Sequence, residues 1–385
     1  MVYIVAPMRS SPLPRIAVLA AGLALASGVL AGPAAARPFA PRTVAQLDRA
    51  LSSSMGAQWA PGAIVGVWSG DRAWTTTRGL TRRGGGTRPT RAFHTRIGSV
   101  TKTFTGTLIL QLADEGKLRL DETIDRWFPT FPNAKGITVY QLGTMASGIA
   151  SYTLDDAVAS RYLAAPTSPW TPAQLIDAAA SLPPRFAPGA GFQYSNSNFV
   201  LLGEIVARVT GQPFAAALRQ RILKPLGLDD TSYPSGTAVP SRTLHGYTTQ
   251  GSADGSVLDA TRWNPSFADA AGQMISTLGD LRVWTRALGR GTLLKPATQR
   301  LRLRPNPASA GGGRSYDFAI GTDHGWLAHD GALPGYNSQV AYFPKRDISI
   351  VVLTNADLAG SGGTPAPAIF RALAKVVTPG NLPMG

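Results

Sequence analysis

The chain has 385 residues, a formal net charge of +15 and no cysteine. At this length it can bury one large core or two smaller ones, and its 44% hydrophobic content suits a globular protein. The absence of cysteine excludes disulfides, thiolate zinc sites, iron–sulfur clusters and a cysteine nucleophile.

The N-terminus has the order of a secretory signal peptide. Two arginines precede an uncharged run over residues 16–30, and the alanine triplet at 34–36 offers an A-x-A cleavage site. We therefore expect residues 1–36 to be a signal peptide and the mature protein to be secreted, periplasmic or part of the cell envelope. An uncleaved anchor is the alternative, because residues 16–36 are long enough to span ~30 Å of hydrocarbon as a helix. No later segment is apolar enough to do so.

The positive charge predicts a surface that attracts polyanions, and an anionic cell envelope is a partner that fits export. A solvated surface without such a partner is the simpler alternative. The basic residues are scattered singly or in short groups, without a reading motif or an aromatic stacking strip. We therefore expect no nucleic-acid partner.

Strand patterns occupy both ends of the chain and helical patterns occupy its middle. Residues 44–55 predict a short helix, 62–68 and 72–78 a β-hairpin, and 81–91 a surface loop. From Ser99 onward, apolar residues recur every four positions until Gly116, which predicts a helix. Further helices are expected at 138–145, 172–182, 197–210 and 367–377, and strands at 339–343 and 348–353.

This order predicts an α+β fold with a sheet assembled from both chain ends and an all-helical domain inserted between its halves. We place the discontinuous sheet domain at residues 37–98 and 266–380, and the mainly helical domain at 99–265. A cleft between two such parts is a natural place for a site.

Ser99 and Lys102 form a Ser-x-x-Lys motif at the start of a predicted helix, where an i, i+3 spacing places both side chains on one face. A partly desolvated lysine can be neutral enough to take the proton of a serine nucleophile. Backbone N–H groups of the first turn would favour the negative charge that develops during acylation. The alternative for this motif alone is a serine that caps a helix beside an exposed lysine.

Tyr194 and Asn196 form a Tyr-x-Asn motif in a turn before another helix. Tyr194 can pass a proton between Ser99 and a leaving group if nearby positive charge lowers its pKa, and the Asn196 amide can hold a substrate carbonyl or Lys102. The alternative is that Asn196 caps the helix and Tyr194 packs in the core.

His329, Asp330 and Gly331 shortly precede the last predicted strand pair. A strand edge with Gly331 lets a substrate backbone approach closely, and the Ala332 N–H can join the Ser99 N–H in an oxyanion hole. His329 would add a proton relay or a hydrogen bond, although a lone histidine near a glycine turn can also be structural. The other histidines carry no metal-ligand spacing.

Together these motifs resemble those of the serine penicillin-recognising enzymes: class C β-lactamases, D-alanyl-D-alanine carboxypeptidases and related esterases. The resemblance runs over residues 44–373, with further matching stretches at 116–121, 146–149, 225–228 and 271–277. It implies a β-lactamase/transpeptidase-like fold with an antiparallel sheet flanked by helices. It also implies Ser99 as nucleophile, Lys102 as its activating partner, Tyr194 as proton shuttle and Asn196 as substrate ligand.

The chain departs from the family pattern at three positions. His329-Asp330-Gly331 stands where β-lactamases of this class usually carry Lys-Thr-Gly, and His-x-Gly is more similar to the peptidase and esterase branches. Asp330 would repel the carboxylate of a C-terminal D-alanine unless arginines offset it. Met145 stands where many relatives have histidine, and we expect its role to be structural.

We therefore expect a serine hydrolase that resembles D-alanyl-D-alanine carboxypeptidases and acts on cell-wall peptides. An esterase or amidase on small acyl substrates is the alternative, because Asp330 leaves room for an ester, amide or amine-bearing substrate. A β-lactamase and a non-catalytic envelope-binding protein rank lower. The expected chemistry requires no metal and no organic cofactor.

Overall fold

The computed structural model describes residues 36–56, 60–358 and 364–383. Apart from Ala36, the expected signal peptide lies outside these residues. Within the described ranges, no helix is both long enough and apolar enough to cross a membrane.

The central element is an eight-stranded sheet in the order β1-β3-β2-β12-β11-β10-β9-β8. β1 and β3 are parallel, and the other neighbours are antiparallel. Its strands are β1 (Arg37–Pro38), β2 (Gly62–Ser69), β3 (Arg72–Gly79), β8 (Arg314–Tyr316), β9 (Gly321–Asp323), β10 (Trp326–Leu333), β11 (Tyr336–Phe343) and β12 (Ile348–Thr354).

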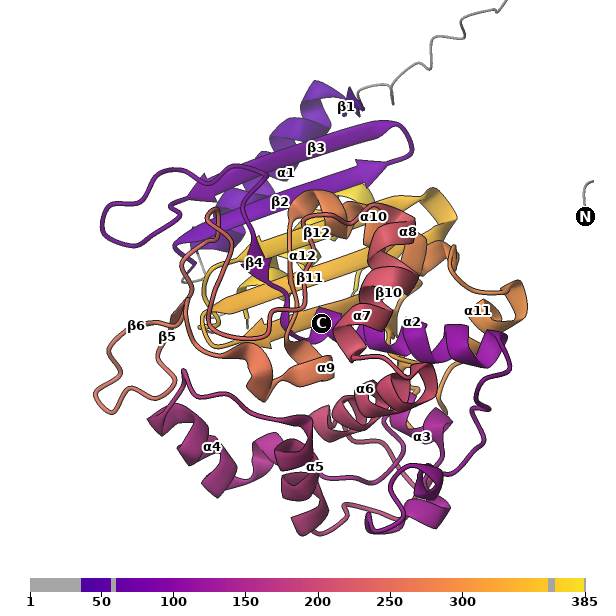
Figure 1. Ribbon diagram of the computed structural model, residues 1–385. Helices are drawn as coiled ribbons and strands as arrows, with labels where there is room; N and C mark the ends of the chain where they lie inside the picture. The colour runs from indigo at the N-terminus through magenta and orange to yellow at the C-terminus, as the bar shows by residue number, and fades with distance from the viewer. Residues whose placement is uncertain (1–35, 57–59, 359–363, 384–385) are drawn as a thin grey trace, which may run out of the picture. The chain divides into compact units, whose positions relative to one another are not determined.

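The two ends of the chain meet where β2 pairs with β12, with Gly66 opposite Val351. The indigo and yellow strands therefore share one sheet in Figure 1. Both strands are buried along most of their length, which explains their Val- and Ile-rich sequences. The predicted fold class, a sheet built from both chain ends and flanked by helices, is confirmed.

Helices cover both faces of the sheet. On one face, α1 (Pro41–Gly56) and α12 (Pro365–Val377) pack their apolar sides against alternate residues of β2 and β12. Val65 and Val352 belong to this layer, whereas their neighbours Ile64 and Val351 belong to the core on the other face. That second face carries α10 (Leu278–Arg290) and the 3-10 turn Gly98–Val100, which leads into α2 (Thr101–Asp114).

The middle of the chain supplies further helices, as the sequence pattern predicts. Two of them begin with a capping box, formed by Thr138 with Gln141 and by Thr171 with Gln174. Besides α2, they are α3 (Val139–Gly143), α4 (Asp156–Ala164), α5 (Pro172–Ser181), α6 (Asn196–Thr210), α7 (Phe214–Leu218), α8 (Lys224–Leu226) and α9 (Asp269–Gly272). Of these, α3, α4, α5 and α6 are drawn below the sheet in Figure 1. The proposed division into a sheet domain and a helical domain stays a prediction.

Two short pairings anchor the chain just before Ser99. β4 (Thr95–Arg96) pairs with β7 (Ile275–Ser276), and the Ile97 N–H donates to the Met274 carbonyl at 3.0 Å. α9 ends close by, at Gly272. These contacts bring a segment some 170 residues downstream against the start of α2, and this proximity completes the site.

Candidate active site

Ser99 and Lys102 lie together at the start of α2. Ser99 is the middle residue of a 3-10 turn, Gly98–Val100, that leads directly into the helix. The Lys102 Nζ lies 2.9 Å from the Ser99 Oγ, as the i, i+3 spacing predicts. Lys102 is fully buried, so the alternative of an exposed lysine beside a capping serine does not describe this helix.

Three oxygens surround the Lys102 amine. Besides Ser99 Oγ, they are Asn196 Oδ1 and the Ala271 carbonyl oxygen, each at 2.8 Å. The carbonyl oxygens of Asn196 and Ala271 can only accept, so two amine hydrogens point to them. In a neutral amine the remaining lone pair then faces the Ser99 hydroxyl and can take its proton.

The burial of Lys102 favours the neutral form of its amine. Desolvation lowers the pKa of Lys102 to about 7, although the negative charge of Asp330 acts in the opposite direction. At neutral pH a substantial fraction of Lys102 is therefore unprotonated, as a general base requires.

Tyr194 and Asn196 come from the turn into α6. Asn196 is the first helical residue and turns its side chain to Lys102, whereas Ser195 occupies the N-cap position. The Asn196 Nδ2 lies 3.4 Å from the hydroxyls of Ser151 and Thr153, which orients the amide. The capping alternative for Asn196 therefore does not describe its side chain.

The Tyr194 ring lies beside the amine, with its centroid 4.9 Å from Lys102 Nζ. Desolvation raises the pKa of Tyr194 well above its usual value, and a hydrogen bond with Ser99 only partly opposes this shift, so the lowered pKa expected from nearby positive charge is not found. Tyr194 is thus protonated at neutral pH and available as a proton donor. The residue is 37% exposed, so part of it is accessible from solvent.

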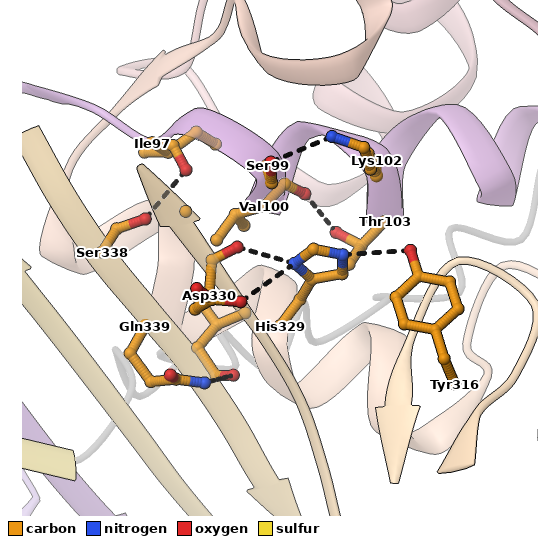
Figure 2. A network of polar contacts seen from close by, with 12 residues as sticks. Ile97, Ser99, Val100, Lys102, Thr103, Tyr316, His329, Asp330, Ser338 and Gln339 are labelled. Atoms are coloured by element: carbon orange, nitrogen blue, oxygen red, sulfur yellow. Dashed lines mark hydrogen bonds and ion pairs between the residues drawn. The ribbon is translucent and has the colours of Figure 1, made fainter. Parts of the chain in front are cut away.

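His329 lies on β10 and is almost fully buried. Its Nδ1 is 2.6 Å from the Asp330 carbonyl oxygen, and its Nε2 is 3.1 Å from the Tyr316 hydroxyl, as Figure 2 shows. Burial lowers the pKa of His329 to about 4. The Asp330 side chain is 58% exposed, 4.0 Å from His329 Nδ1.

β10 packs directly against the segment that carries Ser99. A side chain on Gly331 would collide with the Ile97 carbonyl oxygen, and a Cβ on Gly98 would lie 2.7 Å from the Ala332 nitrogen. Ser338 of β11 donates to the same Ile97 carbonyl at 2.8 Å. Ser99 and Ala332 also line one cavity, an arrangement compatible with the predicted oxyanion hole.

That cavity has a volume of about 280 Å³ and mostly apolar walls. Tyr162 and Phe267 stack in it with ring centroids 4.1 Å apart, and Tyr152 meets Phe267 edge to face. A second hollow of about 450 Å³ is lined by Asp330, with Arg314, Asp323, Arg371 and Tyr316 around it. Tyr194 lines both hollows and so stands between them.

Met145 supports the turn that carries Tyr194. It is fully buried with φ of 60°, and its sulfur accepts hydrogen bonds from Ser195 N at 3.4 Å and Asn198 Nδ2 at 3.6 Å. Its carbonyl oxygen accepts from Gln193 N at 3.1 Å. These contacts agree with the structural role expected of Met145.

Sequence reasoning missed several groups around the site. They are the Ala271 carbonyl on Lys102, the Ser151 and Thr153 hydroxyls on Asn196, and Tyr316 on His329. Every residue has a backbone carbonyl, so the sequence does not indicate which one contacts Lys102. Single serine, threonine or tyrosine residues form no motif that would predict a contact with the site. Across the described ranges, no group of three or more His, Cys, Asp or Glu side chains is placed to hold a metal ion.

Comparison with known proteins relates the chain to hydrolases and penicillin-binding proteins of the β-lactamase fold. The family model Beta-lactamase matches residues 47–374. A D-stereospecific amidohydrolase from Streptomyces sp. is 34% identical, with a TM-score of 0.76 over 85% of this chain and 97% of that one. A D-amino acid amidase from Ochrobactrum anthropi SV3 is 25% identical, with a TM-score of 0.77 over 87% and 97%. Penicillin-binding protein 4 of Amycolatopsis lactamdurans is 28% identical over 81% of this chain and 84% of its own length.

Proposed function

The chain belongs to the Beta-lactamase family, and from that premise we propose that it is an exported serine hydrolase that cleaves the amide bond after a D-amino acid residue. The acyl group would be carried by Ser99. One observation carries this proposal: the buried Lys102 amine, with its pKa near 7, lies 2.9 Å from the Ser99 hydroxyl. Export rests on the arginines, apolar run and alanine triplet of residues 1–36.

Acylation would begin when the Ser99 oxygen attacks the substrate carbonyl carbon and its proton passes to the neutral Lys102 amine. The N–H groups of Ser99 and Ala332 would bind the resulting oxyanion. Tyr194, which is protonated at neutral pH, would donate its proton to the departing amine and recover one from Lys102. Water would later attack the ester, with Lys102 again as base, and release the acid.

A D-configured acyl donor is supported by the relatives, since one is named a D-stereospecific amidohydrolase and the other a D-amino acid amidase. The apolar cavity beside Ser99 supports a bulky, uncharged group on the acyl side. Both supports concern the half of the substrate that stays on the enzyme, and neither fixes the leaving group.

A D-alanyl-D-alanine carboxypeptidase is the second candidate. The penicillin-binding relative and the basic composition of an exported chain favour it. The exposed Asp330 carboxylate argues for an uncharged or amine-bearing leaving group, because it repels a terminal carboxylate. Arg314 and Arg371 line the same hollow and would offset part of that repulsion.

The test compares hydrolysis of D-phenylalanine amide, its L enantiomer and an acylated D-Ala-D-Ala peptide by the mature protein. We expect turnover of the D-amide, little turnover of the L-amide, and loss of all turnover in Ser99→Ala. Measuring the intact mass of the protein after incubation with a penicillin would detect the acyl-enzyme directly. Release of D-alanine from the peptide without amide turnover would replace the first candidate by the second, and activity in Ser99→Ala would refute both.

A further inference from the structure

Tyr316 joins the strand that carries His329 to the turn that carries Tyr194. It is the last residue of β8, and its hydroxyl lies 3.1 Å from His329 Nε2. Its ring meets the His329 ring at 83° and the Tyr194 ring at 89°, with centroids 5.7 and 5.8 Å apart. Figure 2 shows Tyr316 on the far side of the imidazole from Asp330.

The hydrogen-bond partners of His329 indicate which of its two ring nitrogens carries a hydrogen. The Asp330 carbonyl oxygen, 2.6 Å from Nδ1, can only accept, so Nδ1 carries a hydrogen. In a neutral imidazole Nε2 is then an acceptor, and the Tyr316 hydroxyl donates to it. Both ring nitrogens are therefore used by partners other than Ser99 and Tyr194.

The surroundings keep this imidazole neutral. Desolvation lowers the pKa of His329 to about 4; the positive charge of Lys102 on α2 acts in the same direction, and Asp330 on its own strand opposes it. Tyr194 and Tyr316 face the ring as neutral hydroxyls, and Arg314, Asp323 and Arg371 line the hollow beside it.

We infer that Tyr316 is a positioning residue that holds His329 in its Nδ1–H tautomer, so that His329 serves as a fixed neutral partner beside Tyr194 and does not carry the proton of the leaving group. This role rests on the proposed hydrolysis at Ser99. The lone pair of Nε2 is the single basic site of a neutral Nδ1–H imidazole, and the Tyr316 hydrogen occupies it. Proton transfer then falls to Lys102 and Tyr194.

Nitrogen NMR tests the tautomer without requiring any activity. In ¹⁵N-labelled wild type, we expect the His329 signals to show Nδ1–H and an acceptor Nε2, with no protonation down to about pH 5. His329→Gln assigns the signals among the four histidines. Tyr316→Phe removes the donor to the neutral form, so the pKa of His329 should rise by about one unit. An Nε2–H tautomer, or protonation of His329 between pH 6 and 7 in the wild type, would overturn the inference.

Kinetics then separates positioning from proton transfer. Tyr316→Phe should lower kcat about five- to tenfold with little change in KM, and should add a second ionisation to the acid limb of the pH profile. His329→Gln can still accept from Tyr316 but cannot carry a proton, so we expect a loss of about tenfold or less with the single ionisation retained. A loss of about 10²–10⁴-fold would identify His329 as a proton carrier and overturn the proposal.

Phe192→Leu is the matched control. Phe192 contacts the Tyr316 ring with centroids 6.0 Å apart but has no hydroxyl to donate, so this variant disturbs packing alone. We expect the His329 tautomer and the shape of the pH profile to stay as in the wild type. A Tyr316→Phe variant that behaves like Phe192→Leu would overturn the inference. If the wild type hydrolyses no substrate, the proposed function fails, and the NMR result still decides whether Tyr316 sets the state of His329.

Discussion

Asn196→Asp places a negative charge against the proposed general base with almost no change in shape. The Asn196 Oδ1 lies 2.8 Å from Lys102 Nζ, and an aspartate oxygen would take the same position. The second carboxylate oxygen would face the Ser151 and Thr153 hydroxyls, 3.4 Å from the present Nδ2. Hydroxyl groups can turn to donate, so the substitution leaves no buried group unpaired.

The expected magnitude follows from this contact. An opposite charge at hydrogen-bond distance raises the pKa of a cation by about one to three units. The pKa of Lys102 would therefore move from about 7 toward a range of about 8 to 10. At pH 7 about half of the wild-type Lys102 amine is neutral, whereas a pKa of 8 to 10 would leave about 10% to 0.1% neutral, so acylation should slow by about 5- to 500-fold and recover at alkaline pH.

The assay is single-turnover acylation by a penicillin or an activated ester, followed by intact mass or stopped-flow absorbance from pH 5 to 10. The wild type should show an acid limb with a midpoint near 7, and Asn196→Asp should show the same limb displaced to higher pH. Asn196→Ala removes the acceptor without adding charge, so its midpoint should not rise. An unchanged midpoint in Asn196→Asp would refute Lys102 as the base.

Three further outcomes are expected. Gly331→Ala places a Cβ against the Ile97 carbonyl oxygen, so it should lower the free energy of unfolding by about 1–3 kcal/mol and remove most activity. Gly279→Ala is its control: the nearest atom to the new Cβ would be 3.8 Å away, so the melting temperature should not fall. Met145→Leu removes the sulfur that accepts from Ser195 N, and should lower the free energy of unfolding by about 1 kcal/mol and kcat several-fold in parallel denaturation and rate measurements. Folding lowers the pKa of Lys102, so the unfolded chain binds the proton of this lysine more tightly than the folded chain does. The free energy of unfolding of the wild type, measured relative to Lys102→Met, should therefore rise by up to about 1.4 kcal/mol per pH unit between about pH 7 and 10. A stability difference between the two proteins that does not change with pH would contradict the lowered pKa.

The sequence alone determined the elements whose pattern is local. The hairpin of β2 and β3, the helices α2, α5 and α6, and the strand pair β11 and β12 lie within a few residues of their predicted positions. The alternation of apolar and polar residues in strands and their 3.6-residue repeat in helices involve only neighbouring residues, so the sequence predicts them without knowledge of the fold. The adjacency of Ser99 and Lys102 belongs to the same class, because one helical turn joins them.

The tertiary structure decided which distant groups complete the site. The Ala271 carbonyl lies 169 positions from Lys102 in the chain, and Asn196 lies 94 positions away, yet both hold its amine. Tyr316 on the edge strand β8 contacts His329 on β10, and β9 lies between these two strands in the sheet. No local repeat encodes such contacts, because they depend on how the whole sheet and the helices pack. The same packing buries Lys102 and so lowers its pKa, which turns an ordinary lysine into a candidate base.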